Sequence, residues 1–353
     1  MELRPEWRHL PFAFIVPGYD DNDLITVQKN ETEDHNCFDR TLTAFCAAYG
    51  VIPASIRYMI SYPLEDSPRF ELLSPARSQP SEYSALELLA VFRSLRYNES
   101  FHSISFSRIR LDILNDLIDP HGVEYVLIPS QYGPNLKAVF NDPASTSLLV
   151  QEIRALAVSS SQLRRLDVSY CFPAPSTSEY SLSPPIPSVF GILEALTPLC
   201  KGQSTGVDWL VLNGVKIHGR DMEKLLDLVS DKRCRFRALE VKQCGMNEDA
   251  TEIFMDAIRA QSKTLEAIDI SQNKLRIDTS SWARLLSPHR ALRKLDLSGL
   301  STSSSSEPLL ALPLLAGWKL EQLRLAGLEL NQASVDALSQ SVHRDSVRAC
   351  TDP

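Results

Sequence analysis

The sequence predicts an α/β solenoid in which one strand–turn–helix unit is repeated along the chain. The first observation is a recurring pattern of apolar residues with the spacing L-x-x-L-x-L-x-x-N/C-x-L. Residues 265–275 show it most clearly, because the consensus positions are occupied by Leu265, Ile268, Ile270, Asn273 and Leu275. Copies of the pattern begin at residues 101, 123, 163, 207, 236, 265, 292 and 320.

The spacing of these copies is the second observation. The last four intervals are 29, 29, 27 and 28 residues, which leaves room for a strand, a turn and a full helix in each repeat. The pattern and its period are those of the leucine-rich repeat, which stacks into a horseshoe with parallel strands on the concave face and helices on the convex face. We therefore expect residues 101–330 to form one curved sheet of eight parallel strands.

The consensus also predicts which side chains form the core. Side chains alternate between the two faces of a strand, so the first, fourth and sixth positions should point towards the helices. The second, third and fifth positions should face the hollow of the concave face. Burial is expected for the fourth-position residues Ile104, Leu166, Leu210, Leu239, Ile268, Leu295 and Leu323. At the ninth position, Cys171 and Cys244 should fit inside the turn as structural thiols.

The repeat pattern divides the chain into regions. Residues 1–82 do not fit the pattern, and we expect them to cover the exposed end of the solenoid as a linker or cap. The repeat domain spans residues 83–342 and is interrupted at residues 172–187 by a Pro/Ser-rich insert that cannot be regular helix or strand. Residues 343–353 form a polar tail, and the abrupt end after the last repeat suggests a truncated form of a longer protein.

Local signals predict several individual elements. We expect a helix or strand at residues 37–49 and a strand at residues 55–62, from their apolar residues. Asp221, Asn247 and Asn331 precede helical patterns. Short polar side chains at such positions accept hydrogen bonds from the first helical turn, so each is predicted to be an N-cap.

Composition and charge exclude several classes of function. A net charge of −8 and the lack of a basic run argue against a nucleic-acid partner. No stretch approaches about 18 apolar residues, so no transmembrane segment is expected. The seven cysteines include no C-x-x-C motif, which suits a reducing compartment and predicts a cytoplasmic protein. No group of side chains has metal-ligand spacing, so neither a metal nor a cofactor is expected.

One short motif matches a catalytic signature. Residues 202–206, Gly-Gln-Ser-Thr-Gly, fit the G-x-S-x-G nucleophile elbow, in which Ser204 would be the nucleophile. That elbow needs a strand before the serine and a helix after it. Here a helix is predicted before the motif and a strand after it. We therefore interpret residues 202–206 as a turn and expect no hydrolase activity.

Parallel strands lie in register about 4.8 Å apart, so same-numbered positions should form rows across the concave face. The second-position row alternates in charge from Glu124 onward, through Arg164, Asp208, Arg237, Glu266, Arg293 and Glu321. This row is either a ladder of weak, solvated ion pairs that sets the register or a rigid template for a charged partner. The fifth-position row contains an acidic stretch, Glu240, Asp269 and Asp296.

We predict that a protein partner docks in the hollow over the third to seventh repeats. The candidate contacts are Arg164, Arg165, Asp167, Asp208, Trp209, Glu240, Asp269, Arg293 and Asp296. Trp209 is expected on an open face, either as a binding hot spot or packed beneath the Pro/Ser insert. In the first case Trp209→Ala should weaken binding and leave folding nearly intact. In the second it should lower the melting temperature and leave affinity unchanged.

The segment before the first repeat resembles a known family. Residues 95–101, Leu-Arg-Tyr-Asn-Glu-Ser-Phe, are similar to the L-x-Y-N-x-W-F entry segment of the CARMIL proteins. Residues 38–95 look like their linker, and residues 265–297 look like one of their late repeats, as in fungal-type repeat proteins of the same build. The CARMIL proteins regulate actin and combine a pleckstrin-homology domain, a linker, a leucine-rich repeat domain and a disordered tail.

This resemblance implies a link to actin assembly and a place at the cell cortex or cytoskeleton. The sequence shows neither the pleckstrin-homology domain nor the basic capping-protein-binding motif, so capping-protein binding is not implied. Our interpretation is a non-enzymatic scaffold for protein interactions. The alternative is a GTPase-activating protein, because the Ran GTPase-activating protein is a horseshoe of similar period. A small GTPase would then be the partner, although the long acidic tail of that family is absent here.

Overall fold

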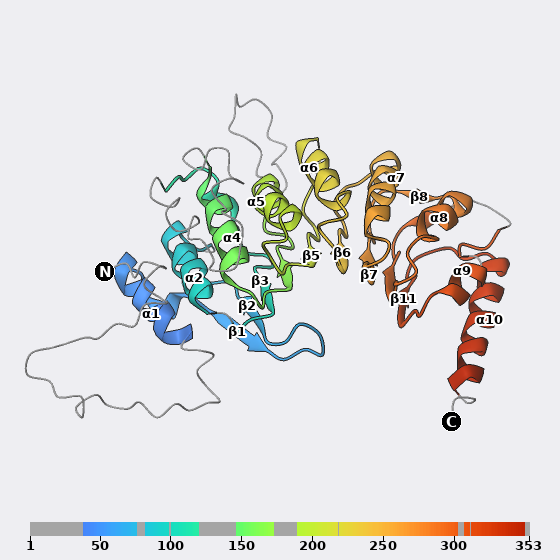
Figure 1. Cartoon of the computed structure of the whole chain (residues 1–353), viewed down its shortest axis with the longest axis horizontal. Coiled ribbons are helices and arrows are strands. Elements are labelled where there is room, and N and C mark those ends of the chain that lie inside the picture. Colours follow the sequence, from blue (N-terminus) through green and yellow to red (C-terminus); the bar gives the residue numbers. More distant parts are fainter. Residues whose placement is uncertain are drawn as a thin grey trace, which may run out of the picture.

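The chain forms a solenoid-like α/β arrangement around one nine-stranded sheet (Figure 1). The computed structural model describes residues 38–75, 82–98, 100–119, 146–172, 189–217, 219–302, 307–310 and 312–349. The strand order is β1-β2-β3-β4-β5-β6-β7-β9-β11, in which β1 and β2 are antiparallel and all later neighbours are parallel. The strands are β1 (Tyr58–Ser61), β2 (Arg69–Leu72), β3 (Ser103–Ser105), β4 (Arg165–Asp167), β5 (Trp209–Val211), β6 (Ala238–Glu240), β7 (Ala267–Asp269), β9 (Lys294–Asp296) and β11 (Gln322–Arg324).

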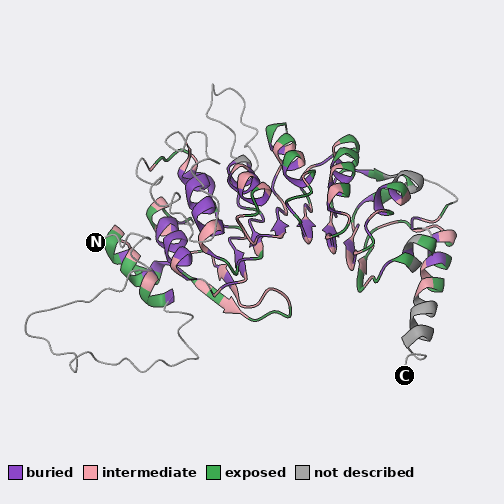
Figure 2. Cartoon of the chain, in the orientation of Figure 1, coloured by how far each residue is buried: buried purple, intermediate pink, exposed green. Residues whose placement is uncertain are grey.

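Helices cover one face of this sheet. Helices α2, α4, α5, α6 and α7 lie side by side along it, and each packs against the next (Figure 1). Buried residues lie on the strands and on the helix surfaces turned towards them (Figure 2). The helices are α1 (Phe38–Tyr49), α2 (Ala85–Tyr97), α4 (Leu148–Ser159), α5 (Phe190–Lys201), α6 (Arg220–Val229), α7 (Glu248–Ala257), α8 (Thr279–Leu286), α9 (Leu312–Gly317) and α10 (Gln332–Ala349). The opposite face of the sheet is called the open face below.

Short elements complete the described part of the chain. Three 3-10 helices lie at Pro53–Ser55, Asp112–Leu114 and Ile258–Gln261. Strands β8 (Arg276–Ile277) and β10 (Ser301–Thr302) pair in a small parallel sheet of their own. Within the described ranges, none of the helices has both the length and the apolar character needed to cross a bilayer.

Seven of the eight predicted repeat strands are present in the large sheet, from β3 to β11. The copy beginning at residue 123 lies outside the described residues. However, β3 pairs directly with β4, so the prediction of a strand between them is wrong. An apolar spacing alone does not determine whether a segment enters a sheet, because the spacing carries no information about the neighbouring strands. In addition, β1 and β2 extend the sheet beyond β3, at the edge opposite to β11.

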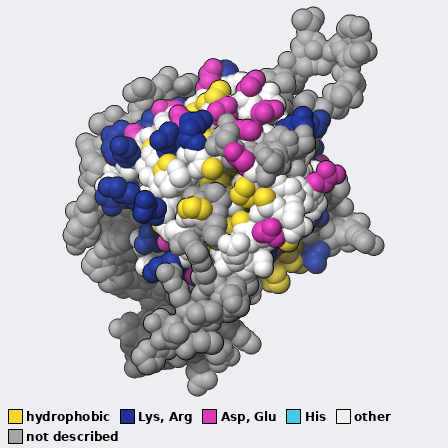
Figure 3. All heavy atoms as spheres, turned by 90° about the vertical axis from the view of Figure 1, so that its right-hand side faces the viewer, with side chains coloured by type: hydrophobic (Ala, Val, Ile, Leu, Met, Phe, Trp, Pro, Cys, Tyr) yellow, Lys and Arg dark blue, Asp and Glu magenta, His cyan; other side chains and the backbone are white. Residues whose placement is uncertain are grey.

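The predicted core is largely confirmed. Six of the seven fourth-position residues have at most 2% of their surface exposed. The exception is Leu323, which is only partly buried. It lies on β11, which is the edge strand of the sheet, so within the described residues it has a neighbouring strand on one side only. This end of the molecule faces the viewer in Figure 3, where hydrophobic side chains are visible between charged ones.

The turn after each repeat strand has a common backbone geometry. The eighth consensus position adopts a positive φ in all seven repeats, at Arg108, Tyr170, Gly214, Gln243, Gln272, Gly299 and Gly327. Few side chains tolerate this region, and at Gly214 the neighbourhood is also crowded. A Cβ atom there would lie 2.0 Å from the ring of Tyr170. The shared geometry shows that the repeats are structurally equivalent beyond their strands.

The ninth consensus position ties neighbouring repeats together. Cys171 and Cys244 place Sγ 3.0 Å and 3.2 Å from the carbonyl oxygens of Phe106 and Leu212, one repeat earlier. Burial raises the pKa of the Cys171 thiol well above its ordinary value and that of Cys244 to about 12. Both thiols therefore stay protonated and donate to these oxygens. The prediction that they are structural is confirmed.

Asn273 performs the same role with more hydrogen bonds. Its Nδ2 donates to the carbonyl oxygens of Val241 and Ile270 at 2.9 Å and 2.8 Å, and its Oδ1 accepts from the backbone N–H of Met246 at 3.2 Å. The side chain is buried. One residue thus satisfies three backbone groups that water cannot reach, where an unmade hydrogen bond is costly.

The region before the repeats packs on the first of them. Residues 38–49 are a helix, which decides between the two predicted alternatives, and β1 confirms the strand expected within residues 55–62. Phe38 of α1 lies edge-on to Phe70 of β2 and to Phe101, with ring centroids 5.1 Å and 5.7 Å away. Strand β2 was not predicted.

Helix capping follows the predictions in two cases out of three. The Oδ1 atoms of Asn247 and Asn331 accept from the backbone N–H of Ala250 and Ser334 at 3.0 Å and 2.8 Å. Asp221 is not an N-cap, because α6 begins one residue earlier and Gly219 precedes it. Helix α10 continues to Ala349, so the first part of the predicted polar tail is helical.

We predict that Asn273→Ala lowers the free energy of unfolding by about 2–4 kcal/mol, because buried backbone groups lose their partners. Urea denaturation followed by circular dichroism measures this change. Lys274→Ala is the matched control, since its side chain is exposed and its removal should change the free energy by less than about 0.5 kcal/mol. Equal stability of the two variants would contradict the assigned role of Asn273.

A second prediction concerns His289, which lies between α8 and β9. The residue has no exposed surface, and neither ring nitrogen has a hydrogen-bond partner in the described part of the chain. Burial, with a smaller effect of the Arg259 charge, lowers the pKa of His289 to about 4. In the unfolded chain the ordinary pKa is about 6.5, so below that pH the unfolded state binds a proton that the folded state excludes.

The free energy of unfolding should therefore fall by about 3 kcal/mol between pH 6.5 and pH 4 through His289 alone. Stability curves of the wild type and of His289→Leu, measured across this range, isolate the contribution. The leucine variant should lose less stability on acidification, because it has no group to protonate. Parallel curves for the two proteins would exclude this role for His289.

Candidate functional site

The register of the strands places equivalent side chains of the open face in rows. On the third-position row, Arg165 pairs with Trp209, followed by Ala238, Ala267, Lys294 and Gln322. On the fifth-position row, the residues in order are Asp167, Val211, Glu240, Asp269, Asp296 and Arg324. Backbone hydrogen bonds connect the second-position row in the same manner, from His102 through to Glu321. The predicted rows are thus present.

Ion pairs connect much of the second-position row, as its alternating charges predicted. Asp208 lies between Arg164 at 3.9 Å and Arg237 at 3.4 Å. Arg293 lies between Glu266 at 3.2 Å and Glu321 at 2.7 Å. Glu124, the proposed start of the alternation, lies outside the described residues. Partly exposed pairs of this kind contribute little stability each, about 0–1 kcal/mol, so their main effect is to hold the side chains in place.

Trp209 is buried, with only 6% of its surface accessible, so it is not the open side chain of the hot-spot alternative. The other alternative, packing beneath the Pro/Ser insert, involves residues outside the described ranges. The indole Nε1 of Trp209 donates to Glu240 Oε1 at 2.8 Å. Three cations surround the ring: Arg165 at 4.3 Å, Arg237 at 5.1 Å and Lys294 at 5.6 Å from its centroid. Cations are attracted to the electron-rich face of an indole. The residue therefore organises the charged side chains around it.

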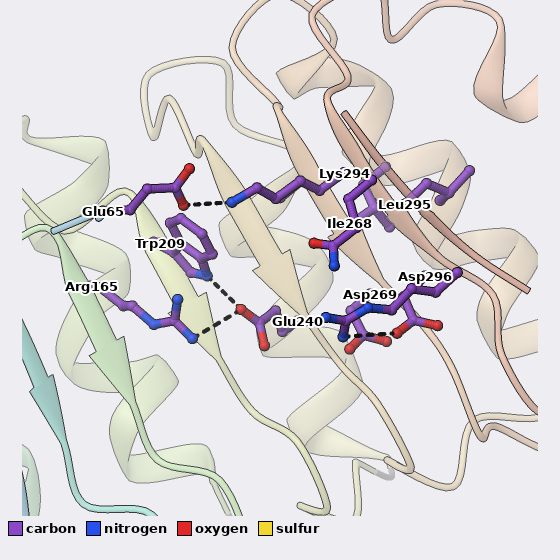
Figure 4. Close-up of a pocket in the computed structure, with 12 residues that line it drawn as sticks. Glu65, Arg165, Trp209, Glu240, Ile268, Asp269, Lys294, Leu295 and Asp296 are labelled. Atoms are coloured by element: carbon purple, nitrogen blue, oxygen red, sulfur yellow. Dashed lines mark hydrogen bonds and ion pairs between the residues drawn. The ribbon is translucent and has the colours of Figure 1, made fainter. Parts of the chain in front are cut away.

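The loop that connects β1 to β2 covers part of this site, which the sequence did not indicate. This loop, residues 62–68, is called the strap below. Its Asp66 pairs with Arg237 at 2.7 Å. Its Glu65 pairs with Lys294 at 2.7 Å, as Figure 4 shows. In the sequence, Asp66 and Arg237 are separated by 171 positions, and Glu65 and Lys294 by 229 positions. Burial disfavours the charge on Glu65, but the hydrogen bond from Lys294 and its charge hold the pKa of Glu65 below its ordinary value.

A cavity of about 270 Å³ lies beside the strap. Trp209 and Arg165 form one side, Glu65 and Lys294 another, and the acidic stretch of the fifth-position row lies along it (Figure 4). The full lining is Glu65, Arg165, Trp209, Glu240, Ala267, Ile268, Asp269, Lys294, Leu295, Asp296, Gln322 and Arg324. A hollow of this size admits one or two side chains of a partner.

Charges in the cavity are only partly compensated. Glu240 pairs with Arg165 at 3.2 Å, and Asp296 lies 3.7 Å from Arg324. Asp269 lies between these two carboxylates on the row. Burial raises the pKa of Asp269 above its ordinary value, and the neighbouring charges of Asp296 and Glu240 act in the same direction. The acidic side of the cavity therefore favours positively charged groups.

The structure brings together most of the nine predicted contact residues. Five of them line the cavity: Arg165, Trp209, Glu240, Asp269 and Asp296. Arg164, Asp208 and Arg293 lie on the second-position row beside it. Asp167 is different, because it is buried and is bound by Arg69 at 3.3 Å and Ser105 at 3.1 Å. It has little surface to offer a partner. Burial also raises the pKa of Asp208, against the effect of Arg237 and Arg164.

Four further residues belong to the site and were not among the candidates: Glu65, Asp66, Arg237 and Lys294. Arg237 and Lys294 were identifiable from their row positions, which equal those of Arg164 and Arg165. Glu65 and Asp66 had no signal in the sequence beyond being adjacent acids in a loop.

Ser204 lies between α5 and β5, so a helix precedes it and a strand follows it, as the turn interpretation requires. Among the described residues, no cluster of three or more His, Cys, Asp or Glu side chains is arranged to hold a metal ion.

Comparisons with known proteins support leucine-rich repeats. No protein-family model matches the chain. A stretch of 97 residues, 27% of the chain, is 31% identical to the NACHT, LRR and PYD domains-containing protein 4B of Mus musculus. The matched stretch spans only 11% of the length of that protein. The name of that relative includes leucine-rich repeats, in agreement with the repeat pattern, whereas nothing in these comparisons supports the CARMIL family specifically.

We predict that Trp209→Ala lowers the free energy of unfolding by about 3–5 kcal/mol, the usual cost of truncating a buried tryptophan. Chemical denaturation measures this change. Tyr170→Ala is the control, because Tyr170 is also aromatic and also near an arginine, but 39% of its surface is exposed. Its cost should stay near about 1 kcal/mol. A Trp209 variant as stable as the wild type would restore the view that this side chain is free for a partner.

Proposed function

We propose that this chain is a non-enzymatic scaffold for protein interactions, built on a leucine-rich repeat horseshoe, and that its partner binds on the open face over β4 to β9. The observation that carries the proposal is the cavity beside Trp209. An aromatic ring, three cations and an acidic row converge there from strands that are far apart in sequence. Tryptophan and arginine side chains near the centre of an interface are the residues most often responsible for binding energy.

The rigidity of the face supports this proposal. The side chains come from paired strands and are held by ion pairs and by the Trp209–Glu240 hydrogen bond. A partner therefore meets groups that are already ordered, so less conformational entropy is lost on binding. The charged rows also supply orientation, because complementary charges set the register of a complex and exclude wrong partners.

The proposed cellular context rests on the sequence, through the resemblance to the CARMIL proteins and the cysteine usage that suits a reducing compartment. The likeness of residues 95–101 to the entry segment of the CARMIL proteins leads us to propose a partner among actin-regulatory proteins. On the same basis we propose a cytoplasmic protein that acts at the cell cortex. The binding face is proposed independently of this context, from the side chains described above.

Charge reversal on the two faces of the sheet tests the proposal. Proteins recovered on the full chain from cell extract are identified by mass spectrometry, and the affinity of a purified partner is then measured by calorimetry. We expect Arg293→Glu on the open face to weaken binding by about 2 kcal/mol or more. The matched control is Arg284→Glu on α8, because Arg284 is also an exposed arginine paired with a glutamate, at 3.0 Å from Glu252.

The control variant should bind like the wild type. If Arg284→Glu weakens binding and Arg293→Glu does not, the partner binds on the helices and the open face is excluded. Folding of both variants is checked by circular dichroism, since an unfolded variant would also fail to bind.

A further inference from the structure

Two charged side-chain contacts attach the middle of the strap to the open face, and at its end the carbonyl oxygen of Pro68 accepts backbone hydrogen bonds from His102 and Ser103. Asp66 contacts Arg237 through both carboxylate oxygens, at 2.7 Å and 2.9 Å, and Glu65 contacts Lys294 at 2.7 Å. The apolar residues of the strap do not contribute a buried anchor. Leu64 is fully exposed, and 69% of the Tyr62 surface is accessible. An exposed leucine is unusual at a permanent contact, where burial of apolar area supplies most of the stability.

The surface beneath the strap is positively charged. Between β4 and β9, the second-position and third-position rows hold five cations and two carboxylates. The cations are Arg164, Arg165, Arg237, Arg293 and Lys294, and the carboxylates are Asp208 and Glu266. Within these two rows the excess is three positive charges, but Arg165 is also paired with Glu240 of the fifth-position row at 3.2 Å. Glu65 and Asp66 of the strap offset the two positive charges that remain. The strap thus neutralises a basic surface that the repeats themselves create.

The shape of the third-position row lets an acidic side chain reach these cations. Ala238 and Ala267 stand between Trp209 and Lys294 on this row. Their small side chains leave a gap that is also lined by Glu65 and Arg237. A larger residue at either position would fill the space above the sheet. Three cations, Arg237, Arg293 and Lys294, and one carboxylate of the sheet, Glu266, line this gap, so an acidic side chain that enters it meets an excess of positive charge.

We propose that Arg237, Lys294 and Trp209 form a receptor site for an acidic peptide segment with two adjacent carboxylate side chains, and that the strap occupies this site as an internal ligand. This inference rests on the proposed function, since it names the chemistry of the partner on the same face. The partner segment replaces Glu65 and Asp66 on Arg237 and Lys294. The strap then leaves the face.

Two opposing effects determine whether a partner segment can replace the strap on the open face. A tethered ligand has an effective concentration that can reach millimolar values, so a free acidic segment of equal strength competes poorly. However, the Glu65–Lys294 pair is about one-third exposed, with 34% and 30% of the two side chains accessible, and such pairs are individually weak. Only 8% of the Asp66 side chain is accessible beside Arg237, so this contact holds the strap more firmly, but the strap has no buried apolar anchor to add to the two. A partner that makes further contacts in the neighbouring cavity gains binding free energy that the strap does not have. Removal of the strap's charges should therefore expose the site to even a short acidic peptide.

Fluorescence anisotropy with the full chain tests this exchange. The probe is a labelled peptide with the sequence of residues 61–68, Ser-Tyr-Pro-Leu-Glu-Asp-Ser-Pro, at low salt. We expect the strap variant E65Q/D66N to bind this peptide at least tenfold more tightly than the wild type. Adding R237Q and K294Q to that variant should abolish binding, and a probe with Gln-Asn in place of Glu-Asp should not bind.

The matched control is E248Q/D249N, which removes an identical Glu-Asp pair at the start of α7, where both residues are exposed. It should bind the peptide as the wild type does. The proposal is overturned if E65Q/D66N binds no more tightly than the wild type, if R237Q and K294Q leave binding intact, or if the control variant gains affinity equally. Should E65Q/D66N fail to fold, E65Q alone removes the Lys294 contact, retains Asp66 on Arg237, and should give a smaller gain.

The two proposals fail in different ways. If the peptide never binds while Arg293→Glu still weakens a protein partner, binding on the open face stands and the acidic segment is wrong. If Arg293→Glu has no effect and the peptide binds E65Q/D66N as expected, the receptor site exists but the recovered partner does not use this face.

Discussion

The structure depends on the strict register between successive parallel strands. Leu166, Leu210, Leu239, Ile268 and Leu295 are direct partners across five strands, and all of them are buried. Side chains alternate between the two faces of a strand. In each repeat, this alignment therefore directs the fourth consensus position to the helices and the third and fifth consensus positions to the open face. A slip by one residue would exchange the two sets. The core and the charged rows are therefore two consequences of the same constraint.

This constraint explains which features could be predicted from the sequence. The apolar period determines the repeat strands, the buried residues and the ninth-position turns, as Cys171 and Asn273 show. Contacts between segments without periodicity could not be predicted. The strap contacts Arg237 and Lys294 across 171 and 229 positions, and no local pattern encodes such a distance. The sequence left open whether Trp209 is a binding hot spot or packed beneath the Pro/Ser insert, and it gave no sign of the strap, whose Glu65 lines the same gap as Trp209.

The open face separates charge by row. Positive charge dominates the second-position and third-position rows, whereas the fifth-position row is acidic from Glu240 to Asp296. Trp209 lies at the boundary, with its ring among cations and its indole nitrogen bound to Glu240. In the free chain the strap neutralises part of the basic side. The face therefore offers a polar pattern that only a partner with matching charges can satisfy without leaving buried charges unpaired.

The most direct test of this account is the indole N–H resonance of Trp209 in an NMR titration, with the resonance assigned from a Trp209→Phe variant. The indole donates to Glu240 at the centre of the proposed binding face, so it reports on that face without a change in its charges. We predict that a purified partner shifts or broadens this resonance at least as strongly as those of the other tryptophans. An unchanged Trp209 resonance in a protein saturated with partner would contradict the central claim that the partner binds on the open face.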